Sequence, residues 1–484
     1  MNGPPASTKQ DRRQSFYNEA QNFLVKTEKF LHEGVNPGGY YKAVWCRDAS
    51  YILKDWFMSG RFEDVMEQVQ HIWSRQVVPE EEGVKIVYGR GSPDMKYKSQ
   101  VASLDFKKTF EGALPTSIFH GHSEVFGKNP DIDSTALMIS TTSWIFDAYL
   151  AAELESKDSP DILPKIRAGS RAPKGLPIPS YSEIIDSISI QMLKAVDYLR
   201  SRDLDNDGLL EQDHNEDWMD SVLRAGKIVY TQACWIMGLT NLSLLLSHTK
   251  MAKEAAEMRD MAEKTVSAVE DQLWSEEEGC YLDKQESHHL GKSYKTLTQD
   301  VSVYLIATTE KTVRDMLGSQ IHSDTNWSDK KLPIRQVPVS EKMLSARAAS
   351  TLDAIRNRIW TDKWPLCTET ELKTSGPWIL DPNIYHNHTF WPWTTGLEML
   401  ARSRYKRYDE CAALFSYMSR TDREGNPLAF YEWLNPITGK GSRAFPFRTG
   451  ISAIRIALTE ILGQMDHDND RMTDVKSVRR TKLT

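Results

Sequence analysis

The sequence has few cysteines, no long apolar run and no recognisable leader. Five cysteines stand far apart among 484 residues, without a CxxC or a short Cys/His spacing: Cys46, Cys234, Cys280, Cys367 and Cys411. Such a set predicts neither a disulfide framework nor a zinc knuckle, and it favours a reducing compartment. No stretch of about 18 apolar residues occurs, and residues 1–13 lack an apolar signal core. We therefore expect a cytoplasmic protein without a membrane partner.

Positive charge is not in excess. The chain has 67 Asp and Glu against 60 Lys and Arg, a formal net charge of −7. No global positive field is available to hold a polyanion, so we expect no nucleic-acid partner. Hydrophobic residues make up 40% and charged residues 26%, which is typical of a folded globular chain with a large core.

Strand patterns are scarce, and residues 84–88 (VKIVY) are the best candidate. Apolar residues at i, i+3 and i+4 predict helices over 16–31, 49–75, 134–154, 181–199, 230–246, 251–273, 301–316, 391–404, 408–418 and 450–462. No motif repeats every 30 to 50 residues, which disfavours common helical arrays. About a dozen paired helices exceed one bundle core but fit a toroid of two concentric rings. We predict an all-α fold, an (α/α)₆ barrel with small β-hairpins in its loops.

Two segments interrupt the helical pattern. Residues 156–180 contain five prolines and several basic residues, and the same helical style continues on both sides, so they predict a surface insertion. Residues 463–484 are charged with few large apolar side chains and predict a flexible C-terminal tail. Residues 1–14 predict a flexible N-terminal tail. The remainder, 15–462, is expected to form a single domain.

Aromatic residues are abundant, with 14 Trp and 18 Tyr. Trp45, Trp218, Trp391 and Trp433 each lie within three residues of a polar or charged side chain, in segments that also contain turn residues. Burial in the core is the plain alternative for any tryptophan. A pyranose has an apolar C–H face and a rim of hydroxyls, so aromatic faces beside polar groups suit a sugar-binding site.

The densest group of acids lies in residues 203–238. Four acids precede Trp218: Glu211, Asp213, Glu216 and Asp217. Asp220 follows Trp218, ahead of a helix that is expected to begin near Lys227. Carboxylates in a loop at the mouth of a helix can point into a cavity. Helix capping is the more common role of a single Asp, but the neighbouring Trp218 and the density of acids here favour a site.

A second acid stands alone in residues 430–440 (FYEWLNPITGK). Glu432 lies between Tyr431 and Trp433 and just ahead of the turn signal Asn435-Pro436. Such a glutamate is often only half exposed without any catalytic role. An aromatic collar can also raise the pKa of a carboxyl group or orient it against the apolar face of a sugar.

Together these segments resemble the inverting α-glycosidases built on an (α/α)₆ barrel, over roughly residues 40–462. Trp218-Met219-Asp220, followed by Gly226-Lys227, is similar to the general-acid segment of the amylo-1,6-glucosidase half of glycogen debranching enzymes. E-x-x-N-P-x-T-G, beginning at Glu432, is similar to the general-base segment of processing α-glucosidase I and its bacterial and archaeal relatives. Two further segments, WCRDA and YHNHTFWPWTTG, stand in the order seen in this glucoamylase-like superfamily.

The resemblance implies hydrolysis of α-glycosidic, foremost α-glucosidic, bonds in one step with inversion. Asp220 would protonate the leaving oxygen and Glu432 would deprotonate a water on the opposite face, with Asp217 as the alternative acid. The expected partner is an oligosaccharide or a small glycoside. The alternatives are a phosphorolytic relative, which needs no base such as Glu432, and a non-catalytic carbohydrate-binding or scaffold protein.

The resemblance also implies a set of substrate contacts. Arg47 and Asp48 match a W-x-R-D element that binds hydroxyls of the −1 sugar, and Trp45 offers a stacking face. Asp133 is a further sugar-contact candidate, with helix N-capping as its alternative. His388 replaces the usual glycine of a Y-H-N-G-x-x-W-P segment, which puts the local loop geometry in question. The other implied contacts are Asp217, Trp218, His386, Asn387, Trp391, Trp393 and Trp433.

One motif suggests a metal. Asp203, Asp205 and Asp207, with Gly208, match positions one, three, five and six of an EF-hand loop. Position twelve is His214, where a bidentate glutamate should stand, so an Asx-rich turn is the alternative reading. A structural Ca²⁺ ion is therefore a candidate, and no other cofactor is expected.

Overall fold

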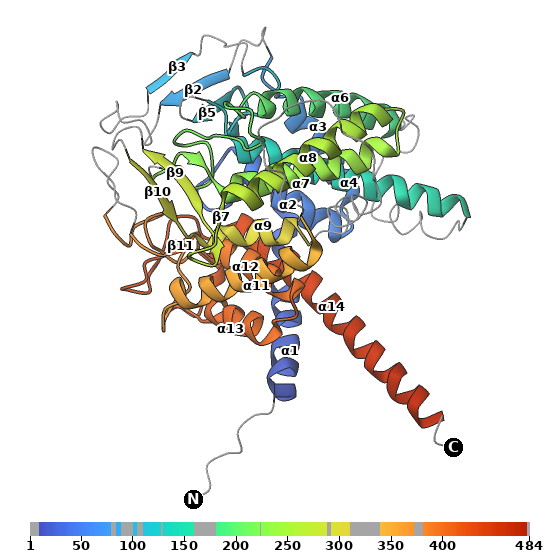
Figure 1. The fold of residues 1–484 in the computed structure, drawn as a ribbon, viewed down its shortest axis with the longest axis vertical. Helices are drawn as coiled ribbons and strands as arrows, with labels where there is room; N and C mark the ends of the chain where they lie inside the picture. The colour runs from blue at the N-terminus through green and yellow to red at the C-terminus, as the bar shows by residue number, and fades with distance from the viewer. Residues whose placement is uncertain are drawn as a thin grey trace, which may run out of the picture.

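The computed structural model describes residues 9–78, 84–88, 100–103, 110–126, 129–158, 181–222, 224–287, 292–309, 339–371 and 381–481. Within these ranges the chain is built mainly of helices, joined by short strands and loops (Figure 1).

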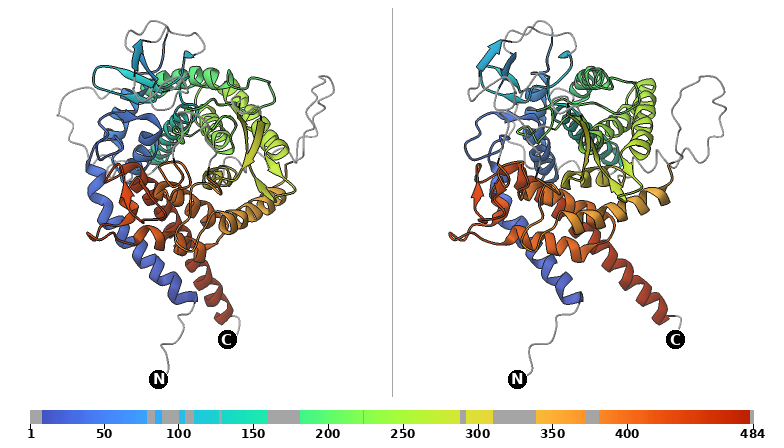
Figure 2. Two further views of the ribbon diagram at one scale, coloured as in Figure 1. Left: turned by 90° about the vertical axis from the view of Figure 1, so that its left-hand side faces the viewer. Right: turned by 60° about the vertical axis from the view of Figure 1, so that its left-hand side comes forward.

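Six of the described helices form a closed inner ring. They are α2 (Cys46–Met58), α4 (Ile132–Asp158), α7 (Val229–Ser247), α9 (Ser302–Ala307), α12 (Pro392–Arg404) and α14 (Arg448–Thr481). Each contacts the next along the chain, and α14 returns to contact α2. Figure 2 (left) shows the helices following one another around the molecule in the order of the sequence colours.

A second set of helices covers the ring from outside. Helix α3 (Phe62–Trp73) packs on α2, α6 (Tyr181–Arg200) on α4, α8 (Ala252–Gln272) on α7, α13 (Tyr408–Ser419) on α12, and α1 (Lys9–Thr27) on α14. Helix α11 (Glu341–Arg358) follows α9 in the chain and contacts β8 (Cys280–Tyr281). Inner and outer helices alternate, so the predicted (α/α)₆ barrel is confirmed.

An outer helix and an inner helix differ in composition, because the outer one has a face exposed to solvent and the inner one is covered on nearly all sides. Helix α3 buries one stripe, which includes Phe62, Val65, Val69 and Trp73, and leaves its other face to solvent. Helix α7 is buried on nearly all sides. Among the described helices it alone is long and apolar enough to cross a membrane, but 83% of its apolar window is buried. Its place in the inner ring explains that composition.

Short strands connect the helices. The largest sheet has the order β1 (Val44–Trp45), β4 (Ser117–Ile118), β5 (Ser123–Phe126), β2 (Val84–Tyr88) and β3 (Gln100–Ser103). A three-stranded sheet joins β10 (Lys292–Thr296), β9 (Asp283–Ser287) and β6 (Gly226–Lys227). Two hairpins pair β11 (Trp433–Leu434) with β12 (Gly441–Ser442), and β7 (Trp274–Ser275) with β8. The strand predicted at residues 84–88 is confirmed as β2.

Several predicted helix boundaries are wrong. The helix predicted over 49–75 is two helices, α2 and α3, because Gly60 adopts a φ of 82° that no right-handed helix contains. Helix α11 was not predicted, since its sequence is rich in small and polar residues. Its start is marked by Ser340, whose hydroxyl accepts a hydrogen bond from the amide of Met343 at 3.2 Å. Helix α9 ends at Ala307, and residues 310–316 of its predicted range lie outside the described residues.

The chain ends also differ from expectation. Helix α14 continues through residues 463–481, for which the sequence predicts a flexible tail, because Gly463 is not followed by any proline or further glycine that would stop a helix. Its last part extends away from the barrel in Figure 1. Helix α1 begins at Lys9, inside the predicted N-terminal tail. Of the predicted insertion 156–180, residues 156–158 belong to α4 and the rest lies outside the described residues.

The barrel topology gathers the candidate residues at one end. An outer helix precedes each inner helix and runs back along the barrel, so all six inner helices run in the same direction. Their N-terminal ends therefore share one mouth, and their positive dipole ends face it. Trp45 precedes α2, Asp133 lies in the first turn of α4, Asp220 precedes α7, Trp391 precedes α12 and Glu432 precedes α14.

Candidate active site

Glu432 is buried and held by three hydrogen bonds. The hydroxyls of Tyr41 and Tyr385 donate to its Oε1 at 3.0 and 3.1 Å, and the amide of Ala444 donates to Oε2 at 2.9 Å. Burial raises the pKa of Glu432, while the Ala444 amide, the charge of Arg443 and the two hydroxyls oppose that rise. The three donors fix the carboxyl group and favour its ionised form, which a general base requires.

Asp220 has a different environment. Its carboxyl group accepts no hydrogen bond from the described residues, and its nearest cationic or imidazole neighbour is Nδ1 of His386, 3.6 Å from Oδ1. Burial raises its pKa to about 6, although the charges of Arg47 and Arg443 act in the opposite direction. A carboxyl group that holds its proton at mildly acidic pH, without a salt-bridge partner, is suited to donate that proton.

Two residues link these carboxyl groups. Burial raises the pKa of Tyr385, and the negative charges of Glu432 and Asp220 raise it further. The guanidinium of Arg443 lies 3.7 Å from the centre of the Tyr385 ring, and its charge lowers the pKa values of both Asp220 and Glu432. The distances agree: Tyr385 donates to Glu432 at 3.1 Å, its ring lies 4.0 Å from that of His386, and His386 Nδ1 lies 3.6 Å from Asp220. The two acids therefore lie around one site.

Backbone conformation marks the same place. Tyr385 and Arg443 have φ values of 52° and 63°, in the left-handed region that residues other than glycine seldom adopt. Neither residue, nor Tyr41, was singled out from the sequence as a site residue. The motif that begins at Tyr385 was a usable signal for that tyrosine, whereas no local pattern marks Arg443.

Asp217, the alternative acid, belongs to a buried ion network. Its Oδ2 lies 2.9 Å from Nη1 of Arg224, and its Oδ1 accepts a hydrogen bond from the amide of Met219 at 2.9 Å. Arg224 also pairs with Asp283 and Asp300, each at 2.8 Å. Asp217 is thus engaged as a counterion for Arg224, so the geometry favours Asp220 as the acid.

Arg47 and Asp48 lie in the first turn of α2, as part of the mouth. Arg47 Nη1 is 3.2 Å from both carboxylate oxygens of Asp133, and Asp48 accepts a hydrogen bond from the Thr449 hydroxyl at 2.5 Å. Asp133 also accepts from the hydroxyl of Tyr230 at 3.2 Å. Helix α4 begins at Ile132, so Asp133 lies inside the helix and is not its N-cap. In the structure it is engaged by Arg47 and Tyr230.

Four of the predicted tryptophans are buried: Trp218, Trp391, Trp393 and Trp433. The ring of Trp218 makes edge contacts with Trp391 at 5.3 Å and with Trp393 at 5.0 Å, and its Nε1 donates to Asp300 at 2.6 Å. The rings of Trp218, Trp391 and Trp393 thus pack together as one aromatic wall. Trp45 is only partly buried, against Tyr41 and Phe126, and is the more accessible stacking face.

His386 is buried in this wall. Its ring stacks on Trp391 at 4.8 Å and lies 4.0 Å from that of Tyr385. Burial lowers its pKa well below the usual value, and the charges of Arg443, Arg47 and Arg224 lower it further. The imidazole is therefore neutral at neutral pH.

The loop that carries His386 keeps the conformation that a glycine would favour. Asn387 is buried, and its backbone amide donates to the backbone carbonyl of Ile384 at 3.0 Å. His388, which stands where the resemblance leads us to expect glycine, has a φ of 61°. Its Nδ1 lies 2.9 Å from the carbonyl of Thr368, a contact that helps to hold the left-handed conformation.

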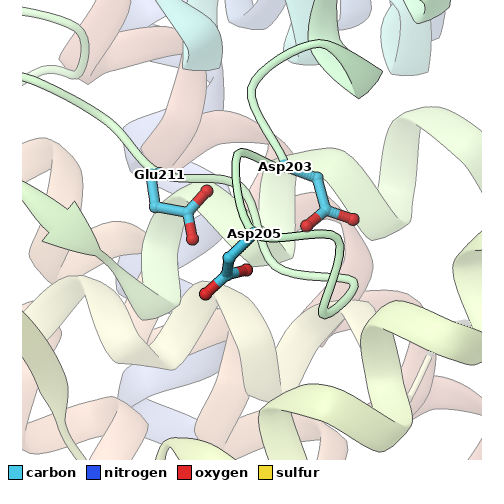
Figure 3. A group of neighbouring side chains, drawn as sticks. All are labelled: Asp203, Asp205 and Glu211. Carbon is cyan, nitrogen blue, oxygen red and sulfur yellow. The ribbon is translucent and has the colours of Figure 1, made fainter. Parts of the chain in front are cut away.

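The EF-hand-like turn already contains a positive charge. Carboxylate oxygens of Asp203, Asp205 and Glu211 lie within 4.8 Å of one another (Figure 3). The ammonium of Lys227 lies 2.8 Å from Asp205 and 3.2 Å from Glu211, and it also pairs with Asp207. The oxygen donors suit Ca²⁺, but an ion there would compete with this lysine. The cluster contains Glu211 as its third acid, where the sequence predicted Asp207. Calcium binding remains a prediction.

Solved structures share this barrel. The chain is similar to the GH63 mannosylglycerate hydrolase from Thermus thermophilus in complex with glucose, with 14% identity, a TM-score of 0.52, and coverage of 92% of this chain and 100% of that one. The same hydrolase with Tris and D-glycerate gives 14% identity and a TM-score of 0.52 over 90% and 99% of the two chains. An uncharacterized conserved protein from Thermus thermophilus is 15% identical, with a TM-score of 0.50, over 92% of this chain and 100% of that one.

No family model and no curated protein matches the chain. At such low identity the structural likeness defines the class of fold. The chain has the six-hairpin barrel that a GH63 hydrolase also adopts.

Proposed function

We propose that the protein is a glycoside hydrolase that cleaves α-glycosidic bonds, foremost α-glucosidic bonds, in one step with inversion at the anomeric carbon. The observation that carries the proposal is the pair of unlike carboxyl groups around Tyr385 and Arg443. Asp220 has a pKa of about 6 and no hydrogen-bonded partner among the described residues, whereas three donors hold Glu432. One group suits proton donation and the other suits proton removal.

In the proposed reaction the two groups act on opposite faces of the sugar. Asp220 donates its proton to the glycosidic oxygen as the bond from that oxygen to the anomeric carbon breaks. Glu432 accepts a proton from a water whose oxygen forms the new bond to the same carbon. Inverting glycosidases separate their two carboxyl groups by about 6.5–9.5 Å to admit that water. Asp220 ends ionised and Glu432 protonated, and exchange with solvent restores both.

The −1 sugar is proposed to sit between the first turn of α2 and the aromatic wall. Arg47 and Asp48 supply donors and acceptors for its hydroxyls, and Trp45 supplies a stacking face. Asp133 holds Arg47 in place at 3.2 Å. Trp218, His386, Trp391 and Trp393 support this site from beneath, and Trp433 and Asn387 complete it beside Glu432.

Arg443 favours an acidic leaving group. It makes no hydrogen bond or ion pair with the described residues, although it lies on Tyr385 beside both carboxyl groups. An unpaired guanidinium with free N–H donors suits a carboxylate. The similar hydrolase from Thermus thermophilus was solved with D-glycerate bound. We therefore propose a small α-glycoside with a carboxylate in the leaving group, such as glucosylglycerate, as the preferred substrate.

Removal of the Arg443 charge tests that preference. Arg443→Met is expected to lower kcat/KM for glucosylglycerate about 10- to 100-fold relative to its effect on uncharged glucosylglycerol, since a hydrogen bond to a charged group contributes about 1.5–3 kcal/mol. Arg443→Lys keeps the charge and should retain part of the preference. An equal loss for both substrates would contradict an anion-binding role.

The proposed reaction class has its own test. Purified protein in phosphate buffer is incubated with glucosylglycerate, mannosylglycerate, maltose, isomaltose, panose, trehalose, sucrose and limit dextrin. Release of free sugar supports hydrolysis, whereas release of a sugar phosphate supports the phosphorolytic alternative. Sugar binding in calorimetry without turnover of any compound would support a carbohydrate-binding scaffold.

A further inference from the structure

The side chain of Asp220 is not fixed by hydrogen bonds of its own. It lies in an irregular segment between Trp218 and β6, and no described residue donates to its carboxyl group. Glu432, by contrast, accepts three such bonds. A general acid must be aimed at one oxygen of the substrate, and a shift of about 1 Å costs on the order of 100-fold in rate. Some other contact has to position this segment.

The neighbouring residue supplies that contact. The hydroxyl of Ser221 lies 2.7 Å from Nδ1 of His386, and the same nitrogen lies 3.6 Å from Oδ1 of Asp220. The acid segment is thereby joined, one residue beyond Asp220, to the loop that leads into α12. Residues 221 and 386 are 165 positions apart, so this bond ties together two loops of the mouth that are distant in the sequence.

His386 is a suitable anchor because it cannot easily move. Its ring stacks on Trp391, lies against Tyr385, and meets the ring of Trp218 edge-on at 5.2 Å. The ring is neutral, because burial and three nearby arginines disfavour its charged form. An imidazolium at this distance would hold Asp220 in its ionised form, whereas a neutral imidazole leaves that carboxyl group free to carry the proton.

We propose that Ser221 is a positioning residue for the general acid: its hydroxyl bonds Nδ1 of His386 and so fixes the backbone that carries Asp220 against the aromatic wall. The inference rests on the proposed glycosidase function. Ser221 itself does not touch the substrate and exchanges no proton with it. Within the single proposed step, its effect is confined to the transfer of the proton from Asp220 to the leaving oxygen.

This division gives a sharp test with two leaving groups. An α-linked glycoside with an alcohol leaving group needs protonation by Asp220, whereas α-glucosyl fluoride releases fluoride with little such help. Ser221→Ala is expected to lower kcat for the alcohol glycoside about 10- to 100-fold, with KM within about threefold of wild type. On the fluoride its kcat should stay within about threefold of wild type. Ser221→Thr keeps the hydroxyl and should recover most of the lost rate.

A matched variant on the base side completes the comparison. Tyr41→Phe removes one hydroxyl that donates to Glu432, so it is expected to slow both substrates by the same factor. If Ser221→Ala proves unstable in a thermal melt, Ser221→Cys takes its place. It fills the same space with only a weak hydrogen-bonding group, so it is expected to give the same kinetic result.

The outcomes separate the two levels of inference. If Ser221→Ala slows both substrates equally, or slows neither, Ser221 does not position the acid. If wild-type protein hydrolyses neither substrate, the glycosidase function fails first, whatever Ser221 does.

Discussion

Glu432→Gln is expected to lower kcat by about two to four orders of magnitude, since it deletes the group that removes a proton from the attacking water. The amide is nearly the same size as the carboxylate, and its oxygen can still accept from the hydroxyls of Tyr41 and Tyr385. In the wild type the backbone amide of Ala444 donates to Oε2 of Glu432 at 2.9 Å, and the NH₂ group of the glutamine cannot accept that hydrogen bond. The local fold should therefore survive with one hydrogen bond fewer.

Three measurements separate chemistry from folding in this variant. Steady-state kinetics give the loss in kcat, calorimetry gives the affinity for the substrate, and a thermal melt gives the stability. We expect normal substrate affinity and a melting temperature within a few degrees of wild type. Glu424→Gln, at an exposed position, is the matched control and should match wild type in all three. Normal kcat in Glu432→Gln would remove Glu432 from the mechanism.

Asp220→Asn is expected to lower kcat by a similar two to four orders of magnitude for glycosides with alcohol leaving groups. It should also change the pH profile. Asp220 must be protonated to act, and its pKa in the folded protein is about 6. Wild-type kcat/KM should therefore fall as the pH rises through about 6, and the residual activity of Asp220→Asn should lack this alkaline limb.

The direction of the change in melting temperature gives a control for Asp220→Asn. The folded-state pKa lies above the ordinary value of 3.8, so the ionised carboxylate destabilises the fold at pH 7. The neutral amide should melt no earlier than wild type. Asp217→Asn should instead melt earlier, because Asp217 pairs with the buried Arg224 at 2.9 Å. Full activity in Asp220→Asn, with none in a stable Asp217→Asn, would reverse the assignment of the acid.

The fold was predictable because helical periodicity is a local property of the sequence. The places where prediction failed have local causes as well. A single residue, Gly60, divides the predicted helix 49–75, and helix α11 carries too few large apolar residues to show its period. The candidate acids were found because acids and aromatic residues stand close together in the sequence and because both segments resemble known motifs. Both lie in loops ahead of inner helices, and the topology brings such loops to one mouth.

The partners of these acids could not be predicted in the same way. Tyr41 is 391 positions from Glu432, and Tyr385 is 47 positions from it, so no spacing rule connects them. Arg443 stands in no motif that the sequence analysis singled out. Ser221 directly follows the acid motif, but no role was predicted for it, because its contact depends on how distant loops pack. For the same reason the sequence could not exclude Asp217 as the acid, because its pairing with Arg224 depends on how the loop folds.

The central claim is tested most directly by following the anomer of the released sugar by ¹H NMR, with the wild-type protein and an α-glucoside that it hydrolyses. We predict that β-glucose forms first and then mutarotates toward the equilibrium mixture, and that the signal is lost in Glu432→Gln. Initial release of α-glucose would contradict inversion and with it the roles of Asp220 and Glu432.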